Sequence, residues 1–246
     1  MGSEQVLASS GTIGERQWKG FYSVSSILLI ATAVVWLAVS WSARALYASG
    51  YPADAASYLD LVSRHQFLAS VTWCLWILAD FLLLAPTVAL YLVLNRHRRT
   101  LALLGALFAM FFNFYDVCVT ELGSLTLVSL SHAYANASTS AARNSIVQAA
   151  TYDYYALPIQ TVLSFAIGSI GYFFWSVAML KSPFRRWTAI FGAAMSLVGI
   201  VGAVAPLSPS SVILGVCQFV CVPGVALWFV FLGVQLYRHT IHLSRE

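Results

Sequence analysis

The stretch from Leu101 to Ser131 reads LALLGALFAMFFNFYDVCVTELGSLTLVSLS and decides the fold class of this chain. It is long enough to cross a hydrocarbon core about 30 Å thick as a helix that rises 1.5 Å per residue. Its only charged residues are two acids, Asp116 near the middle and Glu121 beyond it. A charged carboxylate at this depth costs roughly 2.5–3.5 kcal/mol on insertion scales. The rest of the fold must therefore shelter these two groups or use them.

The composition of the whole chain supports the same class. Of its 246 residues, 60% are hydrophobic and only 9% are charged, whereas a soluble domain typically carries about 25% charged residues. The net charge of +4 does not indicate a nucleic-acid partner, because the basic residues lie at the ends of apolar runs and not along one face. All four cysteines lie inside apolar segments, which argues against a disulfide scaffold.

Six apolar runs predict an all-α, polytopic membrane bundle with six transmembrane helices. A polar N-terminal segment, 1–20, precedes this single bundle, and a basic tail, 238–246, follows it. One additional interfacial helix is expected in the loop after the first span, within residues 55–68. The expected spans cover residues 21–46, 67–94, 101–131, 151–180, 187–204 and 212–237.

The distribution of lysine and arginine predicts the orientation. With the N-terminus in the cytoplasm, ten basic residues flank the spans on the cytoplasmic side and three on the other side. This excess follows the positive-inside rule and places both termini in the cytoplasm. We expect a multi-pass protein of the cell inner membrane whose main partner is the lipid bilayer. The sequence leaves open whether the protein also forms a homo-oligomer or a larger complex.

The third span carries a polar stripe. At 100° per residue, one arc of about 80° holds five polar side chains, those of Asn113, Asp116, Thr120, Ser124 and Ser131. Glu121 is expected about 60° beyond the edge of that arc. Lipid cannot hydrogen-bond such groups, so the stripe should face the interior of the bundle.

Two neighbouring spans add an acid each, Asp80 in the second and Asp153 at the outer start of the fourth. No lysine or arginine is expected at a comparable depth, so four acids cannot all remain charged. Protons, a cation or water must compensate them, unless each acid serves as hydrogen-bonded glue between helices. We take Asp80, Asp116 and Glu121 as candidate catalytic residues, and the candidate ligand-binding residues are Trp73, Trp76, Asn113, Tyr115, Thr120, Asp153 and Gln160.

No metal or other cofactor is expected. His65 and His132, with Asp116, Glu121 or Asp153, offer ligands that suit zinc, copper or iron, but none of the usual histidine spacings occurs. Both lysines lie at the water boundary, which excludes a retinal Schiff base. No histidine lies in the middle of a span, which argues against a bis-histidine haem.

Two segments carry a family resemblance: LLLAPTVALYLVLNRHRRTLALLGALF, from Leu82, and SIGYFFWSVAMLKSPFRRWTAIFGAAMSLVGIVGAV, from Ser169. Together with the long third span they make the region from Leu82 to about Pro206 resemble the uncharacterised bacterial membrane proteins grouped as domain of unknown function 4386. The resemblance implies a bundle of six or seven helices in a bacterial inner membrane, and it implies no reaction.

The chain is also similar, in size and in the placement of its acids, to small membrane-embedded terpene cyclases. Those enzymes use buried carboxylic acids to protonate an alkene or epoxide. The similarity implies that Asp116, Glu121 or Asp80 would donate the proton, and that ring faces would stabilise carbocations. The rings in question are those of Trp73, Trp76, Phe111, Phe112 and Tyr115.

Three hypotheses about function follow. The first is a membrane protein whose acidic pocket, in the outer half of the second to fourth spans, binds a small ligand or proton, or which acts as an accessory subunit. The second is an acid–base enzyme that acts on a hydrophobic, terpenoid-like or lipid-like small molecule. The third is a proton-coupled or cation-coupled transporter.

Overall fold

The computed structural model describes residues 2–48, 50–204 and 212–242, with side chains described for 17–48, 50–203 and 220–242. Within these ranges the chain forms long helices and one π-helical turn, η1. In chain order they are α1 (Gly2–Leu46), α2 (Ala55–Arg64), α3 (Gln66–Tyr115), η1 (Asp116–Glu121), α4 (Leu122–Asn136), α5 (Ser140–Met179), α6 (Arg186–Val204) and α7 (Val212–His242).

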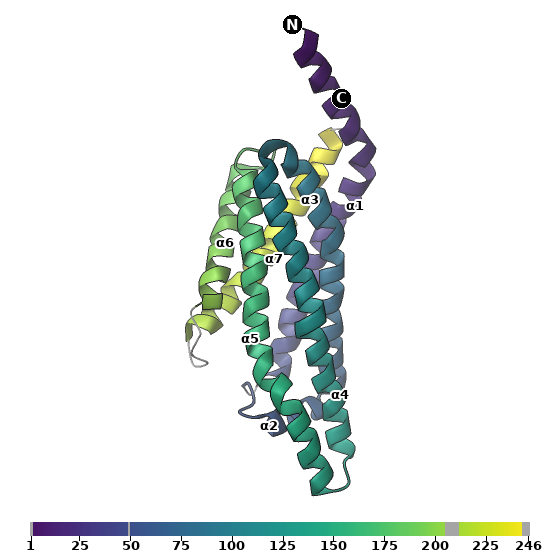
Figure 1. Cartoon of the computed structure of the whole chain (residues 1–246), viewed down its shortest axis with the longest axis vertical. Coiled ribbons are helices and arrows are strands. Elements are labelled where there is room, and N and C mark those ends of the chain that lie inside the picture. The colour runs from purple at the N-terminus through teal and green to yellow at the C-terminus, as the bar shows by residue number, and fades with distance from the viewer. Residues whose placement is uncertain (1, 49, 205–211, 243–246) are drawn as a thin grey trace.

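The helix α3 contains a sharp reversal at Arg98, where φ is −149° and ψ is 72°. Figure 1 shows that the chain turns back on itself within α3. Ring contacts require the same conclusion, because the ring of Trp36 lies 5.8 Å from that of Trp76 and 6.5 Å from that of Phe112, centroid to centroid. In a straight helix Trp76 and Phe112 would be about 54 Å apart. The segment that includes α3, η1 and α4 is therefore a helical hairpin.

In the part of the chain that the structure describes, five helical segments are long and apolar enough to cross a membrane, and one of them is this hairpin. They are Gln17–Leu46, Gln66–Asn136, Ser140–Met179, Arg186–Ala203 and Val220–His242. Figure 1 shows them side by side, with α1 beginning and α7 ending at the same end of the bundle. The reversal of α3 and the α5–α6 connection lie at that end too, so the basic residues of these segments gather there. This arrangement fits the predicted multi-pass membrane bundle.

Several helices extend beyond the spans expected from hydropathy. The chain is already helical from Gly2, so the expected polar segment 1–20 belongs to α1, and its side chains before Gln17 lie outside the described residues. At the other end α7 runs to His242, and the rest of the expected tail lies outside them too. The start of α5 precedes the expected span by 11 residues because Thr139 caps the helix, its hydroxyl accepting from the amide of Ala142. Polar residues can continue a helix outside the hydrocarbon, so hydropathy underestimates its length.

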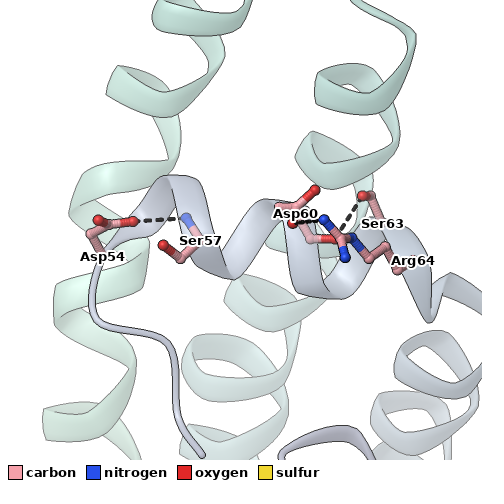
Figure 2. A network of polar contacts seen from close by, with 5 residues as sticks. All are labelled: Asp54, Ser57, Asp60, Ser63 and Arg64. Carbon is pink, nitrogen blue, oxygen red and sulfur yellow. Dashed lines mark hydrogen bonds and ion pairs between the residues drawn. The ribbon is translucent and has the colours of Figure 1, made fainter. Parts of the chain in front are cut away.

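The short helix expected in the loop after the first span is present as α2 (Figure 2). Asp54 caps it by accepting from the backbone amide of Ser57 at 2.7 Å, and this bond holds the pKa of Asp54 below its ordinary value. Asp60 and Arg64, one turn apart, form an ion pair at 2.7 Å on the exposed face. The opposite face, with Tyr58, Leu59 and Val62, is fully buried.

Buried apolar residues form two separate cores. The first, here called the bundle core, lies between α1, α3, α5, α6 and α7, and its largest side chains include Trp36, Trp175, Trp228 and Phe229. The second, here called the cap core, joins α2 to the end of α1 and to the neighbouring parts of α3, α4 and α5. Its members are Leu46, Ala55, Tyr58, Leu59, Val62, Ala69, Leu127, Val128, Ala150, Tyr154 and Leu157.

Tyrosines connect the cap core to the loop before α2. The hydroxyl of Tyr154 donates to the carbonyl oxygen of Pro52 at 2.6 Å, across 102 positions of sequence. Tyr51 stacks on Tyr154 at 5.9 Å between ring centroids. Burial raises the pKa of Tyr47, Tyr51 and Tyr58, so these hydroxyls remain protonated donors at neutral pH.

Within the described residues, Cys74, Cys118 and Cys221 form no disulfide, as expected from their places in apolar segments, and the thiol of Cys221 donates to the carbonyl oxygen of Met195 at 3.7 Å. The side chain of Cys217 lies outside the described residues, as do residues 205–211 between α6 and α7.

Candidate functional site

The hairpin in α3 brings two acids to the same depth. Asp80 precedes Arg98 by 18 residues, and Asp116 follows it by 18 residues. At 1.5 Å per residue, each acid lies about 27 Å from the turn along its own arm. This distance is beyond the middle of a hydrocarbon core about 30 Å thick, so the acids lie in the half away from the basic end.

A π-helical turn adds the third acid. The segment Asp116–Glu121 forms η1, in which hydrogen bonds run from residue i to i+5, so residues five apart come nearly one above the other. In a regular α-helix the same two residues would point about 140° apart. The expected position of Glu121 outside the polar arc is therefore wrong, because a uniform 100° step does not hold through η1. Glu121 is buried on the same side as Asp116.

The carboxyl groups of Asp80, Asp116 and Glu121 form one group, here called the acid cluster. One oxygen from each carboxyl can be chosen so that all three lie within 4.8 Å of one another. The side chains are 1%, 9% and 1% exposed, respectively. Neither oxygen of Asp80 nor either oxygen of Glu121 has a hydrogen-bond partner in the described part of the chain. In the described part of the chain, no lysine, arginine or histidine interacts with any of these three carboxyl groups.

Neutral polar groups surround the acid cluster. Thr120 and Ser164 place their hydroxyls beside Asp116, although neither is oriented for a full hydrogen bond. Asn113, one turn before Asp116, is 2% exposed, and neither atom of its amide has a partner in the described part. The hydroxyl of Tyr172, two turns after Ser164 on the same face of α5, is equally unpartnered in the described part. A buried polar group without a partner is costly, so this concentration of such groups indicates a site that a ligand, ion or water completes.

Some of the expected ligand-binding residues lie close to the acid cluster in sequence and space. Asn113 and Thr120 flank Asp116 within one turn, and Tyr115 is adjacent to it, half-buried, with its ring 6.3 Å from that of Phe111. Trp76 precedes Asp80 by one turn and contacts Trp36 in the bundle core. Trp73, two turns from Asp80, packs instead against the cap core.

Two expected residues on α5 lie farther away. Asp153 is 11 residues before Ser164, which corresponds to about 16 Å along the helix, and it does not belong to the acid cluster. The cause is that α5 runs through this region as one helix from Ser140, so Asp153 lies at the level of the cap core, next to Tyr154. Gln160, one turn before Ser164, directs its amide oxygen toward Gly123 at the start of α4.

His65 and His132, the two histidines considered as metal ligands, are both exposed and lie outside the acid cluster. His65 lies at the junction of α2 and α3. The backbone carbonyl of His132 accepts a hydrogen bond from the amide of Asn136 at 2.9 Å. Within the described residues, the group of side chains with metal-ligating spacing consists of carboxylates alone.

Aromatic side chains line a small pocket in the bundle core. Trp36, Phe112 and Tyr172, together with other residues of α5 and α7, surround this pocket, which has room for about one water molecule. The ring of Tyr172 lies 6.2 Å from that of Phe112 and 5.4 Å from that of Phe229. The three acids are not among the residues that line this pocket.

Two features of the site are new relative to the sequence predictions, the π turn and Tyr172. The acid spacing carried a signal for η1, because two acids five apart in an apolar α-helix would leave one of them facing lipid. Tyr172 lies two turns after Ser164 on the face that also holds Gly168, so its inward position was predictable from helical periodicity.

No protein-family model matches the chain, and no curated protein or solved structure matches it. The resemblances drawn from the sequence therefore remain predictions, and the site has to be interpreted from its own chemistry.

Proposed function

We propose that this chain is a multi-pass membrane protein that binds a small positively charged species, a metal cation or a proton, at the acid cluster. One observation carries the proposal: three buried carboxyl groups from two arms of a hairpin converge, and the described part of the chain supplies no cationic partner for them. Three negative charges within 4.8 Å repel one another strongly in a low-dielectric interior. A bound cation or proton removes that repulsion, so binding and folding support each other.

The proposed membrane placement is six crossings, with the α3 hairpin counted as two. Support comes from the start of α1 and the end of α7 at one end of the bundle, and from the basic residues concentrated in the connections at that end. By the positive-inside rule that end faces the cytoplasm, and the acid cluster then lies in the outer half of the bilayer. A bacterial inner membrane remains the location that the resemblance to the domain of unknown function 4386 implies.

The test compares wild-type protein with the variant Asp80→Asn/Asp116→Asn/Glu121→Gln in lipid nanodiscs. The amide variant keeps the shape of the side chains and removes their charge. We expect the unfolding midpoint of the wild type to respond to pH or to added cations, and the response to disappear in the amide variant. Without cations the amide variant should be at least as stable as the wild type, because no carboxylates repel one another.

A matched control is Asp60→Asn, which removes one exposed carboxylate of α2. Its response to pH and cations should remain that of the wild type. The proposal fails if wild type and the amide variant respond identically over the whole range of pH and salts.

The acid–base enzyme is a second candidate, favoured by the pocket in the bundle core that the aromatic rings of Trp36, Phe112 and Tyr172 line. Ring faces of this kind stabilise carbocations. The pocket lined by these rings holds about one water molecule, so a hydrophobic substrate would require the helices to separate. An enzyme would lose turnover of such a substrate in Asp116→Asn while remaining folded.

A cation-coupled transporter would use the same acids. Its Asp116→Asn variant would lose ion flux into proteoliposomes, whereas a protein that only binds the cation would show no flux in either form. An accessory subunit would instead retain full function in this variant and purify together with its partner.

A further inference from the structure

We propose that the acid cluster binds a hard divalent cation of the size of Ca²⁺ or Mn²⁺, with one carboxyl oxygen from each of Asp80, Asp116 and Glu121 as ligands. This inference names the ion class and rests on the proposed function. The three ligands form no recognisable metal-binding motif in the sequence, because they come from two arms of a hairpin and from a turn that is not α-helical.

The distances suit a single ion of this size. Three atoms that all lie within 4.8 Å of one another share a centre no more than about 2.8 Å from each. Ca²⁺ takes oxygen ligands at about 2.3–2.6 Å, so small side-chain rotations are enough to bring the three oxygens into contact with one ion. Mg²⁺ requires about 2.0–2.1 Å in a near-ideal octahedron and keeps its waters, so it fits this site less well.

The donor atoms suit a hard ion. The acid cluster offers only oxygens, and the nearest neutral groups, Asn113, Thr120 and Ser164, offer oxygens as well. Zinc and copper favour nitrogen or sulfur ligands. Cys74 and Cys118 are exposed, and neither thiol belongs to the cluster.

The buried amide of Asn113 is an independent indication of a ligand. Its oxygen and its nitrogen both lack a partner in the described part, although the side chain is 2% exposed. Asn113 lies one turn from Asp116, on the polar face that both residues share. The hydroxyl of Ser164, on α5, lies beside Asp116 and is equally unpartnered in the described part, with its side chain 1% exposed, so a ligand bound at the acid cluster would complete this group as well.

The charge of the site favours a divalent over a monovalent ion. Three carboxylates carry three negative charges, of which a divalent ion compensates two and Na⁺ only one. The charge that remains can accept hydrogen bonds from Ser164 and Thr120, whose hydroxyls lie beside Asp116 and have no other partner in the described part. Hydrogen bonds to a charged acceptor are the strong ones, so these donors hold the outer shell of the site.

The experiment is a calorimetric titration of the full chain in nanodiscs of phosphatidylcholine, a zwitterionic lipid that attracts few divalent ions. The titrants are Ca²⁺, Mn²⁺, Mg²⁺ and Na⁺, and electron paramagnetic resonance of Mn²⁺ reports an oxygen environment directly. We expect one Ca²⁺ or Mn²⁺ per chain, bound more tightly than Mg²⁺ or Na⁺. Glu121→Gln should weaken binding of Ca²⁺ and Mn²⁺ roughly 10- to 100-fold, and Asn113→Ala should weaken it less.

The control is Asp60→Asn, an exposed acid of α2, which should bind like the wild type. If Glu121→Gln does not fold, the wild-type Mn²⁺ spectrum and the Asn113→Ala titration still decide the case. Equal affinities in Asp60→Asn, Asn113→Ala and Glu121→Gln would mean that the ions bind elsewhere and would overturn the inference.

Failure of the inference and failure of the proposed function give different results. If no divalent ion binds at millimolar concentration, but the pH or Na⁺ response still disappears in the triple amide variant, only the inference is wrong. If the wild type and the triple amide variant respond alike to every cation and to pH, both are wrong.

Discussion

The acids of α2 and the acids of the α3 hairpin differ in whether their carboxylates have a hydrogen-bond or ion-pair partner. On α2 each acid has a local partner: Asp54 accepts from the amide of Ser57, and Asp60 pairs with Arg64 one turn away (Figure 2). In the bundle, Asp80 and Glu121 are buried and their oxygens have no partner in the described part of the chain. This fold can therefore supply partners to acids, and it does so at the surface, where water already solvates the charge.

A buried charge is costly, so a buried carboxylate that has no partner in the protein is best explained by a ligand or ion that binds to it. The acid cluster thus weakens the ligand-free protein, whereas the acids of α2 strengthen their helix. The substitutions below should differ in the sign or the size of their effect on stability, according to the region in which they lie.

The largest effect is expected from Asp80→Leu. Replacing a buried, unpaired acid with an apolar residue of similar volume should stabilise the protein by about 1–4 kcal/mol when cations are removed with a chelator. Asp60→Leu should instead destabilise slightly, by about 0.3–0.5 kcal/mol, because it removes an exposed i,i+4 ion pair. Unfolding in detergent with increasing denaturant measures both. The same sign for the two variants would contradict the comparison.

The next effect concerns packing between the arms of the hairpin and α5. A methyl group added at Gly105 would collide with the indole ring of Trp175, which is fully buried. Gly105→Ala should therefore destabilise by about 1–3 kcal/mol, measured as a lower unfolding midpoint.

The matched glycine is Gly123, at the start of α4, where the nearest atom to an added methyl is the amide oxygen of Gln160 at 3.9 Å. Gly123→Ala should be neutral, or should stabilise by up to about 1 kcal/mol, because alanine favours the helix. A destabilised Gly123→Ala would show that the cap side of the hairpin is packed as tightly as the bundle core.

A smaller effect is expected in the cap core from Tyr154→Phe. This change removes the hydrogen bond to the carbonyl oxygen of Pro52 and should cost about 0.5–1.5 kcal/mol. Faster hydrogen exchange of the α2 amides, with no change in the α5–α6 region, is the expected readout. Tyr152→Phe, at a side chain that is 76% exposed, should leave exchange unchanged.

The smallest effect is the pH dependence of the α2 cap. The pKa of Asp54 is lowered in the folded protein by the amide of Ser57, so its stabilising effect is complete above the pKa of the unfolded chain. That effect should disappear as the pH falls through the lowered folded value. Exchange of the Ser57 amide against pH measures it. In Asp54→Ala this pH dependence should be absent, whereas Asp54→Asn should keep most of the cap without titrating.

The sequence predicted the helical class, the short helix after the first span and the approximate spans, because hydropathy reports directly on burial in lipid. It also placed Asn113, Asp116 and Thr120 on one inward face, since these residues precede or begin the irregular turn. Once the hairpin is known, the closeness of Asp80 and Asp116 can be predicted, because the two acids lie the same number of residues before and after the reversal at Arg98.

The sequence grouped Glu121 with Asp80 and Asp116 and placed Asp153 at the outer start of its span. It did not predict that Glu121 lies on the same side as Asp116, or that Asp153 lies outside the acid cluster. The first depends on a backbone irregularity, and a constant angle per residue cannot represent it. The second depends on how far α5 continues past the lipid, which hydropathy does not report because a helix in water and a loop in water look equally polar. Both errors concern backbone geometry and not the choice of residue types.

The turn η1 also has an evolutionary consequence. A π turn holds one residue more than the α-helical turn it replaces, and so it corresponds to a single inserted residue that leaves the flanking faces in place. Chains descended from the same ancestor without that insertion should carry their two acids four positions apart in an ordinary helix and still direct them to one side. A collection of homologues that mixes both spacings, with Asp80 retained in each, would date the insertion and would indicate that selection acts on the direction of the acids and not on the shape of the helix.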